Sequence, residues 1–384
     1  MSFIRRITPA LHRLDRAVGR LRPTRDVLVE LRTPVYSAVL GPIAEPLAAD
    51  RAIRVWYTSE YPDRIRPIVP AGRFLTHEQV AWRRFDLYLN GDPWAAAWPH
   101  RCAHRVNFFH GVAGKYDLDN PTGLPMGFET YDRVAFINRD RMRRYLGAGV
   151  VTTAQATLVG YPKLDRLATR GWNRDDVLRS IGVDGGRPVV LYAPTYSHAS
   201  SLHLAGEAIV GALAAAGLGV IVKLHDRSLD PDPRYNDGID WRARFRALEQ
   251  PGRVVFVEAH DASPLMAASD ALVTDHSSVG FEFLVLDRPL LVFDAPDLAG
   301  AARINVEKIA LLRSAAGVAR GVNELASMTI AALRDPSRRS ADRRRVAADM
   351  FYEPGTATDR AVALARSFLW PGAGSIAVPA RSAS

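Results

Sequence analysis

The chain has 384 residues, too many for one ordinary hydrophobic core and suited to two domains of roughly 150 residues each. With 48% hydrophobic and 24% charged residues, it is not wholly disordered, collagenous or coiled-coil. A single cysteine, Cys102, excludes an internal disulfide, and no apolar run reaches the roughly 18–20 residues of a spanning helix. The N-terminus lacks the apolar stretch of a signal peptide, so we expect a cytoplasmic protein.

Basic residues outnumber acidic ones and give a net charge of +9, which favours polyanionic partners. Residues 1–32 contain eight arginines and three acidic residues. Apolar residues recur there every three or four positions, on one face of a helix. Two interpretations stay open: a surface helix packed on its own domain, or a basic helix lying peripherally on anionic membrane lipid. We expect no nucleic-acid partner.

Apolar segments then alternate with helical patterns, which predicts two successive α/β units with parallel sheets. The strands predicted in the first half are 53–58, 87–90, 106–109 and 134–138, with helices at 77–85 and 139–146. A polar segment at 170–188 marks the crossing into the second half. The strands predicted there are 189–194, 220–224, 254–257, 271–274 and 290–293, with helices at 205–216, 241–248, 263–268, 277–286 and 358–369.

Polar residues gather where strands end, and in open α/β sheets ligands bind at those ends. His110 follows a strand, and Gly111, Gly114 and Lys115 come next. The glycines allow close approach of the backbone to a ligand, and an imidazole can move protons at neutral pH. The alternative is a loop histidine without a function.

A second cluster follows two strands of the second half. Lys223 and His225 lie two residues apart and therefore on one face if extended, where a cation and an imidazole suit a pyrophosphate. We expect His225 to face the leaving phosphate as a cation. Pro194 and Thr195 leave another strand and line the same site.

The segment 271–283 carries the most specific pattern, because a strand ends and a helix begins within it. Thr274 and Asp275 end the strand, and Ser277 and Ser278 open the helix, whose free backbone N–H groups attract anions. The alternative is that Asp275 or Ser277 only caps the helix. Glu282 is either an acceptor for ribose or glycerol hydroxyls or a surface glutamate.

Metal and cofactor patterns are weak. His100, Cys102 and His104 are spaced two apart, which matches no common zinc pattern, and the DxD triplet at 117–119 is too frequent to indicate a metal. There is no Walker A, G-x-S-x-G or G-x-G-x-x-G at a strand-to-helix turn. We expect no metal and no cofactor.

The order of the motifs is more specific than any one of them. From about residue 108 to 293 the motifs are, in order, HG…K, G-x-P-K-x-D-x-L, LYAPT, KLH and SDALVTDHSSVGFEF…RPLLVFD. This segment resembles the CDP-glycerol glycerophosphotransferase family. Members build the glycerol-phosphate and ribitol-phosphate chains of teichoic acids. The segment FYEPGTATDRAVALA also resembles the closing helix of the family.

The resemblance implies a GT-B architecture, α/β, with two Rossmann-like domains facing across a cleft. It implies an acceptor domain at 36–170, a nucleotide-donor domain at 186–350 and a closing helix at 351–370. The residues themselves predict a basic amphipathic helix region at 1–35 and, from a composition rich in Ala, Gly, Ser and Pro, a disordered tail at 371–384. The resemblance implies that His110 and His225 are catalytic. It also implies that the donor phosphates are bound by Thr274, Asp275, Ser277 and Ser278. The sequence departs from the family at 112–114, at Asp226 and at His276.

The implied reaction moves an alditol phosphate, glycerol phosphate first, from a CDP-activated donor to a hydroxyl of a polymer or lipid-linked acceptor and releases CMP. Two alternatives stay open. One is a GT-B glycosyltransferase that uses a UDP- or CDP-sugar. The other is a non-catalytic nucleotide- or polyanion-binding protein, against which the two strand-end histidines argue.

Overall fold

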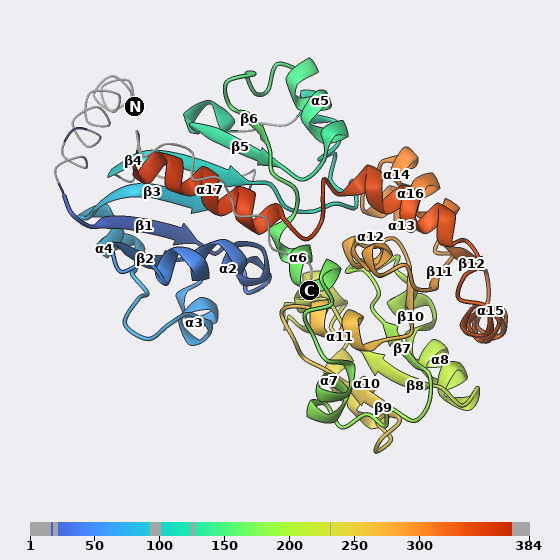
Figure 1. Ribbon diagram of the computed structural model, residues 1–384. Coiled ribbons are helices and arrows are strands. Elements are labelled where there is room, and N and C mark those ends of the chain that lie inside the picture. The colour runs from blue at the N-terminus through green and yellow to red at the C-terminus, as the bar shows by residue number, and fades with distance from the viewer. Residues whose placement is uncertain (1–16, 18–21, 93–100, 124–126, 231, 371–384) are drawn as a thin grey trace, which may run out of the picture. The chain divides into compact units, whose positions relative to one another are not determined.

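The computed structural model describes residues 17, 22–92, 101–123, 127–230 and 232–370. Most of the basic segment 1–32 and the tail 371–384 lie outside the described residues, so the helix and the disorder expected there stay predictions. Internal contacts divide the chain into two units (Figure 1). The first contains Met1–His110, Pro121–Asp165 and Phe351–Ser384, and the second contains Gly111–Asn120 and Arg166–Met350.

The first unit is built on a parallel sheet whose six described strands run in the order β2-β1-β3-β4-β5-β6. The strands are β1 (Arg25–Glu30), β2 (Ile53–Thr58), β3 (Arg84–Asn90), β4 (Arg101–Phe108), β5 (Arg133–Phe136) and β6 (Ala156–Leu158). The α-helices are α2 (Val35–Ala48), α3 (Pro62–Ile65), α4 (His77–Ala81), α5 (Arg139–Gly147) and α17 (Ala357–Leu369). Short 3-10 turns are η1 (Arg66–Ile68), η2 (Pro121–Gly123), η3 (Phe128–Thr130) and η4 (Pro162–Leu164). Helix α17 packs on α2 and β3.

Strand β1 and helix α2 were not predicted from the sequence pattern. β1 lies inside the range 1–35 that was expected to be helical, yet Val27, Leu28 and Val29 are fully buried in the sheet. Helix α2 contains Pro42 and Pro46, which disfavour a helix interior. Burial of its apolar face against β2 offsets that local cost, so tertiary packing overrides the local pattern.

The second unit has its own parallel sheet, with the six described strands in the order β12-β11-β10-β7-β8-β9. They are β7 (Val189–Tyr192), β8 (Gly219–Val222), β9 (Val254–Phe256), β10 (Ala271–Thr274), β11 (Leu290–Phe293) and β12 (Gly317–Ala319). The longer helices are α7 (Arg174–Ser180), α8 (Ser201–Ala215), α10 (Trp241–Ala247), α14 (Val306–Ser314), α15 (Val322–Arg334) and α16 (Ser340–Met350). The shorter ones are α6 (Asp165–Ala168), α9 (Pro233–Asn236), α11 (Ser263–Ala268), α12 (Ser278–Phe283), α13 (Leu298–Ala301), η5 (Asp226–Leu229) and η6 (Leu284–Leu286).

Strands β7, β8, β10 and β11 are buried along their whole length, as expected of parallel strands covered on both faces. The predicted strands of both halves fall on β2–β5 and β7–β11, which confirms the α/β class. One predicted helix is too long: α4 ends at Ala81, because the residues from Arg84 onward belong to β3.

The motif at 160–167 fastens the C-terminal helix to the first unit. Gly160 has φ +92°, and a Cβ there would come within 2.5 Å of the Tyr352 carbonyl oxygen, so only glycine fits. The Asp165 carboxylate accepts hydrogen bonds from the backbone N–H groups of Gly355 and Thr358, at the start of α17. In the part of the chain that the structure describes, no helix is long and apolar enough to cross a bilayer.

Candidate active site

Each sheet has a point at which the strand order reverses, and ligands bind at the carboxyl ends of the strands there. In the first unit the chain passes from β1 to β2 on one side and continues with β3 on the other. In the second unit β8 and β9 lie on one side of β7, and β10 lies on its other side. The candidate residues follow β3 and β4 in the first unit, and β7, β8 and β10 in the second.

His110 follows β4 in the first unit, and a single hydrogen bond fixes its tautomer. Its Nδ1 lies at the carbonyl oxygen of Gly91, which follows β3. A carbonyl oxygen only accepts, so Nδ1 carries the hydrogen and donates it. Nε2 therefore keeps its lone pair, as a general base requires. The ring of Tyr36 packs against the imidazole, with 4.4 Å between centroids.

The surroundings of His110 keep the imidazole neutral. Desolvation lowers the pKa of His110, while the Asp92 carboxylate and the Gly91 carbonyl raise it. The positive charges of Arg141 and Lys163 lower the pKa further, and the outcome is a pKa below the ordinary 6.5.

Asp92 is 4% exposed and forms an ion pair with Arg32, which follows β1. Sequence reasoning missed both residues. The available signal was the polar run Asn-Gly-Asp, which begins at the last residue of β3. An anion beside a neutral imidazole stabilises the imidazolium that forms when the base takes a proton.

The loop after His110 belongs to the second unit, although it was predicted within the first domain. The Gly114 carbonyl accepts a hydrogen bond from the Asn305 N–H at 2.9 Å, and Tyr116 N–H donates to the Ala302 carbonyl at 3.2 Å. Gly114 has φ +65°, and a Cβ there would lie 2.7 Å from the Lys308 side chain.

His276, which departs from the family pattern, also holds this loop. Its Nε2–H donates to the Ala113 carbonyl at 2.7 Å. Burial lowers the pKa of His276 to about 4, so the ring is neutral and donates from one nitrogen only.

Lys115 is therefore a residue of the second unit, although the sequence placed it in the first, acceptor domain. Its ammonium group donates to the hydroxyl of Thr195, directly beyond β7 and the buried Pro194. Desolvation lowers the pKa of Lys115 to about 8, and the nearby Asp275 carboxylate raises it. This lysine is cationic at neutral pH and loses its charge in mildly alkaline solution.

Lys223 and His225 follow β8 and lie in the same cluster. Lys223 is 7% exposed, with its ammonium 3.8 Å from the Asp226 carboxylate. His225 begins η5, and its Nδ1 accepts the N–H of Arg227 at 3.1 Å. Because Nδ1 accepts, the hydrogen of the neutral ring sits on Nε2, which is then a donor.

The surroundings of His225 disfavour the cation that was expected there. Desolvation by the surrounding chain lowers the pKa of His225, and the positive charges of Lys223, Lys115 and Arg227 lower it further. The side chain still reaches solvent, since the residue is exposed. His225 thus offers an accessible N–H dipole beside two cationic lysines.

The segment after β10 is mainly a scaffold for this cluster. Asp275 is 1% exposed and accepts hydrogen bonds from Thr195 N–H at 2.8 Å and from the backbone and hydroxyl of Ser201, both at 2.9 Å. Both carboxylate oxygens thus accept hydrogen bonds from the chain itself, which favours a structural role of Asp275 over the predicted contact with the donor phosphates. Asp275 instead fixes the exit of β7 beside that of β10.

The threonine and serines of this segment divide into two kinds. Thr274 donates to the Ala193 carbonyl at 2.6 Å and contacts the Ser277 hydroxyl at 2.9 Å. Ser277 caps α12 by accepting the Gly280 N–H at 3.3 Å, which confirms the capping interpretation. Ser278 is half-buried at the first position of the helix, where a phosphate-binding role stays a prediction. Glu282 is 2% exposed, which excludes a surface glutamate.

The residues considered for a metal do not form one group. Cys102 and His104 lie on β4, and His100 lies outside the described residues. Among the described residues one other group has metal-ligand geometry, namely His198, His203 and Asp237, whose ligand atoms lie within 4.8 Å of one another. None of these belongs to the clusters above.

Solved structures share this architecture. The wall teichoic acid polymerase TagF superimposes with a TM-score of 0.67 at 15% identity, over 93% of each chain. The UDP-GlcNAc 2-epimerase of Neisseria meningitidis, bound to UDP-GlcNAc, gives 0.55 at 13% identity, over 87% of this chain and 97% of that one. The fold is thus GT-B-like, as predicted. A comparison with curated proteins finds no match.

The amino-acid sequence shows to which family with this fold the chain belongs. Residues 147–364, more than half of the chain, match the model of the CDP-glycerol:poly(glycerophosphate) glycerophosphotransferase family. The chain belongs to that family, which confirms the prediction from the motif order. It is a glycerophosphotransferase that uses a CDP-activated donor.

Proposed function

We propose that the second unit binds CDP-glycerol through Lys115, Lys223 and His225, and that His110 removes the proton from the attacking acceptor hydroxyl. The observation that carries this proposal is the bond between His110 Nδ1–H and the Gly91 carbonyl. It leaves Nε2 as the basic atom of a neutral imidazole, at the carboxyl edge where ligands bind.

The reaction follows from these groups. The acceptor oxygen attacks the phosphorus that bears glycerol, and its proton passes to His110 Nε2. The bond from this phosphorus to the bridging oxygen breaks, and CMP leaves with the electron pair. Negative charge grows on the CMP phosphate, where the ammonium groups of Lys115 and Lys223 and the Nε2–H of His225 stabilise it.

Asp275 serves this donor site as a positioning residue. Its bonds to Thr195 and Ser201 hold the loop after β7, and the Thr195 hydroxyl in turn accepts from Lys115. The placement of the Lys115 charge therefore depends on Asp275, which itself does not contact the donor.

The acceptor that we propose is a glycerol-phosphate polymer or lipid-linked glycan of the teichoic-acid kind at the cytoplasmic membrane face. Support comes from the family and from the fold shared with TagF, a variant of which is known after a soak with CDPG. The basic, amphipathic sequence that precedes β1 supports a peripheral membrane location.

The test is product release from a panel of donors. Purified protein is incubated with CDP-glycerol, CDP-ribitol and UDP-sugars in the presence of a glycerol-phosphate oligomer, and free CMP and UDP are measured. We expect acceptor-dependent CMP release that is fastest with CDP-glycerol, and the His110→Ala variant gives the background. Release of UDP but not CMP would instead establish the glycosyltransferase alternative.

A further inference from the structure

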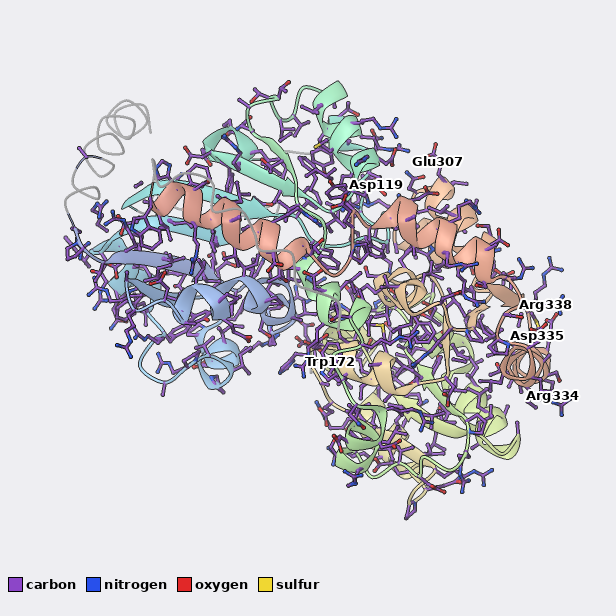
Figure 2. The ribbon with its side chains drawn as sticks, viewed as in Figure 1. Asp119, Trp172, Glu307, Arg334, Asp335 and Arg338 are labelled. Atoms are coloured by element: carbon purple, nitrogen blue, oxygen red, sulfur yellow. The ribbon has the colours of Figure 1, made fainter. Side chains whose placement is uncertain are left out.

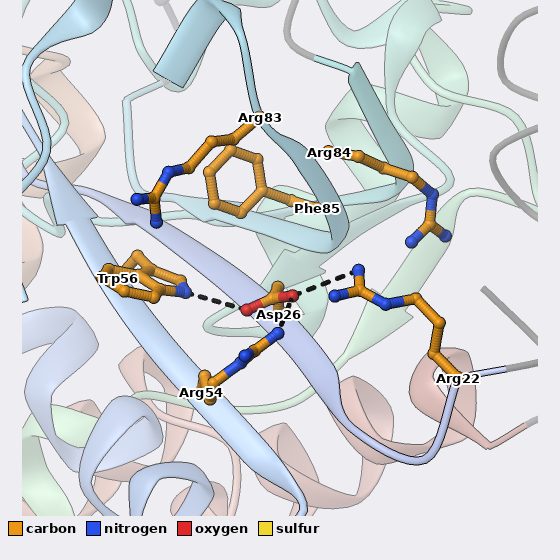
Figure 3. Close-up of a pocket in the computed structure, with 7 residues that line it drawn as sticks. All are labelled: Arg22, Asp26, Arg54, Trp56, Arg83, Arg84 and Phe85. Atoms are coloured by element: carbon orange, nitrogen blue, oxygen red, sulfur yellow. Dashed lines mark hydrogen bonds and ion pairs between the residues drawn. The ribbon is translucent and has the colours of Figure 1, made fainter. Parts of the chain in front are cut away.

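A basic pocket lies in the first unit, at the edge of the sheet that the candidate active site does not use. It has a volume of about 180 Å³ and is lined by Arg22, Asp26, Arg54, Trp56, Arg83, Arg84 and Phe85 (Figure 3). These residues lie at or near the amino ends of β1, β2 and β3. His110 follows the carboxyl end of β4 in the same parallel sheet, so the two sites lie at opposite edges.

The pocket holds more positive than negative charge. Asp26 pairs with Arg54 at 2.7 Å and with Arg22 at 3.3 Å, and it accepts the Trp56 Nε1–H at 2.9 Å (Figure 3). A second carboxylate, Asp86, pairs with Arg84 at 2.9 Å. Four guanidinium groups thus face two carboxylates, which leaves an excess of two positive charges.

The four arginines differ in their exposure. The Arg84 side chain, which pairs with Asp86, is 10% exposed, whereas those of Arg22 and Arg54 are 38% and 40% exposed. Arg83 is exposed and lies over the Trp56 ring at 4.7 Å from its centroid. Arg54 Nε is buried, and no described residue accepts a hydrogen bond from it. An anion from solution can therefore reach the excess charge, and guanidinium groups match the oxygens of a phosphate in pairs.

We propose that this pocket binds a phosphate group, as a phosphomonoester or phosphodiester, at a site distinct from that of the donor. One or two negative charges match the excess of two positive charges. The lining residues carry neither an imidazole nor a hydroxyl nucleophile, so the site binds and does not react. This inference stands apart from the proposed function, because no residue of the active site takes part.

The phosphate can come from a soluble molecule or from a lipid headgroup. Trp82 helps to separate these sources, because it is 89% exposed, precedes Arg83 in the chain and does not line the pocket. A lipid surface gains from insertion of an exposed tryptophan, whereas a soluble phosphate does not.

The experiment titrates the full chain with inorganic phosphate by calorimetry, and in parallel sediments it with phosphatidylcholine vesicles that contain or lack phosphatidylglycerol. The test variants are Arg54→Gln and Arg83→Gln. The matched control is Arg73→Gln, because Arg73 also lies over Trp56, at 5.3 Å, but does not line the pocket. Circular dichroism and thermal melting confirm that each variant is folded.

We expect saturable binding that weakens about tenfold in each test variant, as for the loss of one charge-assisted contact, and that is unchanged in Arg73→Gln. Asp26→Asn, where it folds, binds phosphate more tightly because one competing carboxylate charge is gone. If the test variants lose binding to vesicles only, and Trp82→Ala loses it too, the phosphate comes from a lipid headgroup. If the test variants lose binding to inorganic phosphate, the phosphate comes from a soluble molecule. Equal binding by wild type and both test variants in both assays overturns the proposal. The proposal is also overturned if Lys223→Gln, in the donor site, abolishes phosphate binding while the two test variants leave it unchanged.

Discussion

The carboxyl edges of the two sheets each present a histidine, and the two imidazoles are prepared in opposite ways. In His110 of the first unit, Nδ1 donates to the Gly91 carbonyl, so Nε2 is a base. In His225 of the second unit, Nδ1 accepts from the Arg227 N–H, so Nε2 is a donor. One backbone group opposite Nδ1 therefore decides whether the same side chain takes a proton or offers a hydrogen bond.

The charges around the two rings follow the same division. An anion, Asp92, stands near His110 and favours the imidazolium that a base becomes. Cations, Lys223 and Lys115, stand near His225 and oppose its protonation, while they attract an anionic ligand. The comparison teaches that the residue type identifies neither role, whereas the partner of Nδ1 and the sign of the nearest charge identify both.

The largest effect is expected at His110. Replacement by Ala removes the base and should lower kcat about 10²–10⁴-fold, with donor affinity unchanged. Rates of CMP release and calorimetric titration of CDP-glycerol measure the two quantities. Tyr36→Leu serves as a packing control, since Tyr36 contacts the ring without a proton-transfer role. Near-normal turnover by His110→Ala would show that His110 is not the base.

His225 should come second. His225→Ala removes one N–H donor from the leaving phosphate, and such a loss costs about 10²–10³-fold in kcat. His225 acts as a hydrogen-bond donor without a charge. His225→Gln, which also offers a neutral N–H, should therefore recover part of the rate. Steady-state kinetics of the three enzymes decide this. Full activity of His225→Ala with CDP-glycerol would contradict the assignment.

The effect at Lys115 should be smaller and should depend on pH. Lys115→Met should weaken donor binding about tenfold, the loss expected for one charge-assisted contact. In wild type the pKa of Lys115 is about 8, so the cation is present below pH 8 and is lost above it. Donor affinity should therefore fall as the pH rises through 8. Lys115→Arg stays charged and should abolish this dependence; a fall of equal size in that variant would assign it to another group.

The acid limb of the pH profile tests the environment of His110. Its pKa lies below 6.5, so the midpoint of the acid limb of kcat/KM should lie below pH 6.5, where the base becomes protonated. Asp92 raises this pKa, so Asp92→Asn should move the acid limb to still lower pH. A shift toward higher pH would show that Asp92 does not act on His110 through its charge.

The smallest effects are expected at the two serines, and they should differ in kind. Ser277→Ala removes the cap of α12 and should lower the free energy of unfolding by about 1 kcal/mol, with donor affinity little changed. Ser278→Ala should leave stability unchanged and weaken CDP-glycerol binding by about 1 kcal/mol. Chemical denaturation and calorimetry on both variants separate them. Equal stability of Ser277→Ala and wild type would contradict its capping role.

The sequence was informative wherever a buried strand ran directly into polar residues. His110, Lys223 and Thr274 were placed correctly at or directly after the ends of strands on this basis, because apolar runs and polar exits are local signals. The sequence did not predict β1, because arginines precede its three buried apolar residues. It did not predict α2 either, because this helix contains prolines and is stabilised by burial.

Roles that depend on contacts far apart in the chain were out of reach of the sequence. Nothing local shows that Asp275 bonds to Thr195 and Ser201, or that the loop containing Lys115 folds with the second unit. The tautomer of His110 also depends on such a contact. Gly91 precedes His110 by 19 residues, and only the pairing of β3 with β4 brings the two together.

The path of the chain through the two units also sets an order for its synthesis. The second unit ends at Met350, and its earlier piece, Gly111–Asn120, is made long before. The first unit lacks α17 until residues 357–369 emerge, although the Asp165 carboxylate accepts a hydrogen bond at the start of this helix and Arg25 of β1 donates to its Leu369 carbonyl. A nascent chain halted after residue 350 would therefore hold every residue of the second unit while the first sheet still exposed the face that α17 covers. Such a chain exposes apolar surface to chaperones until α17 has been made, and the first unit closes after the second.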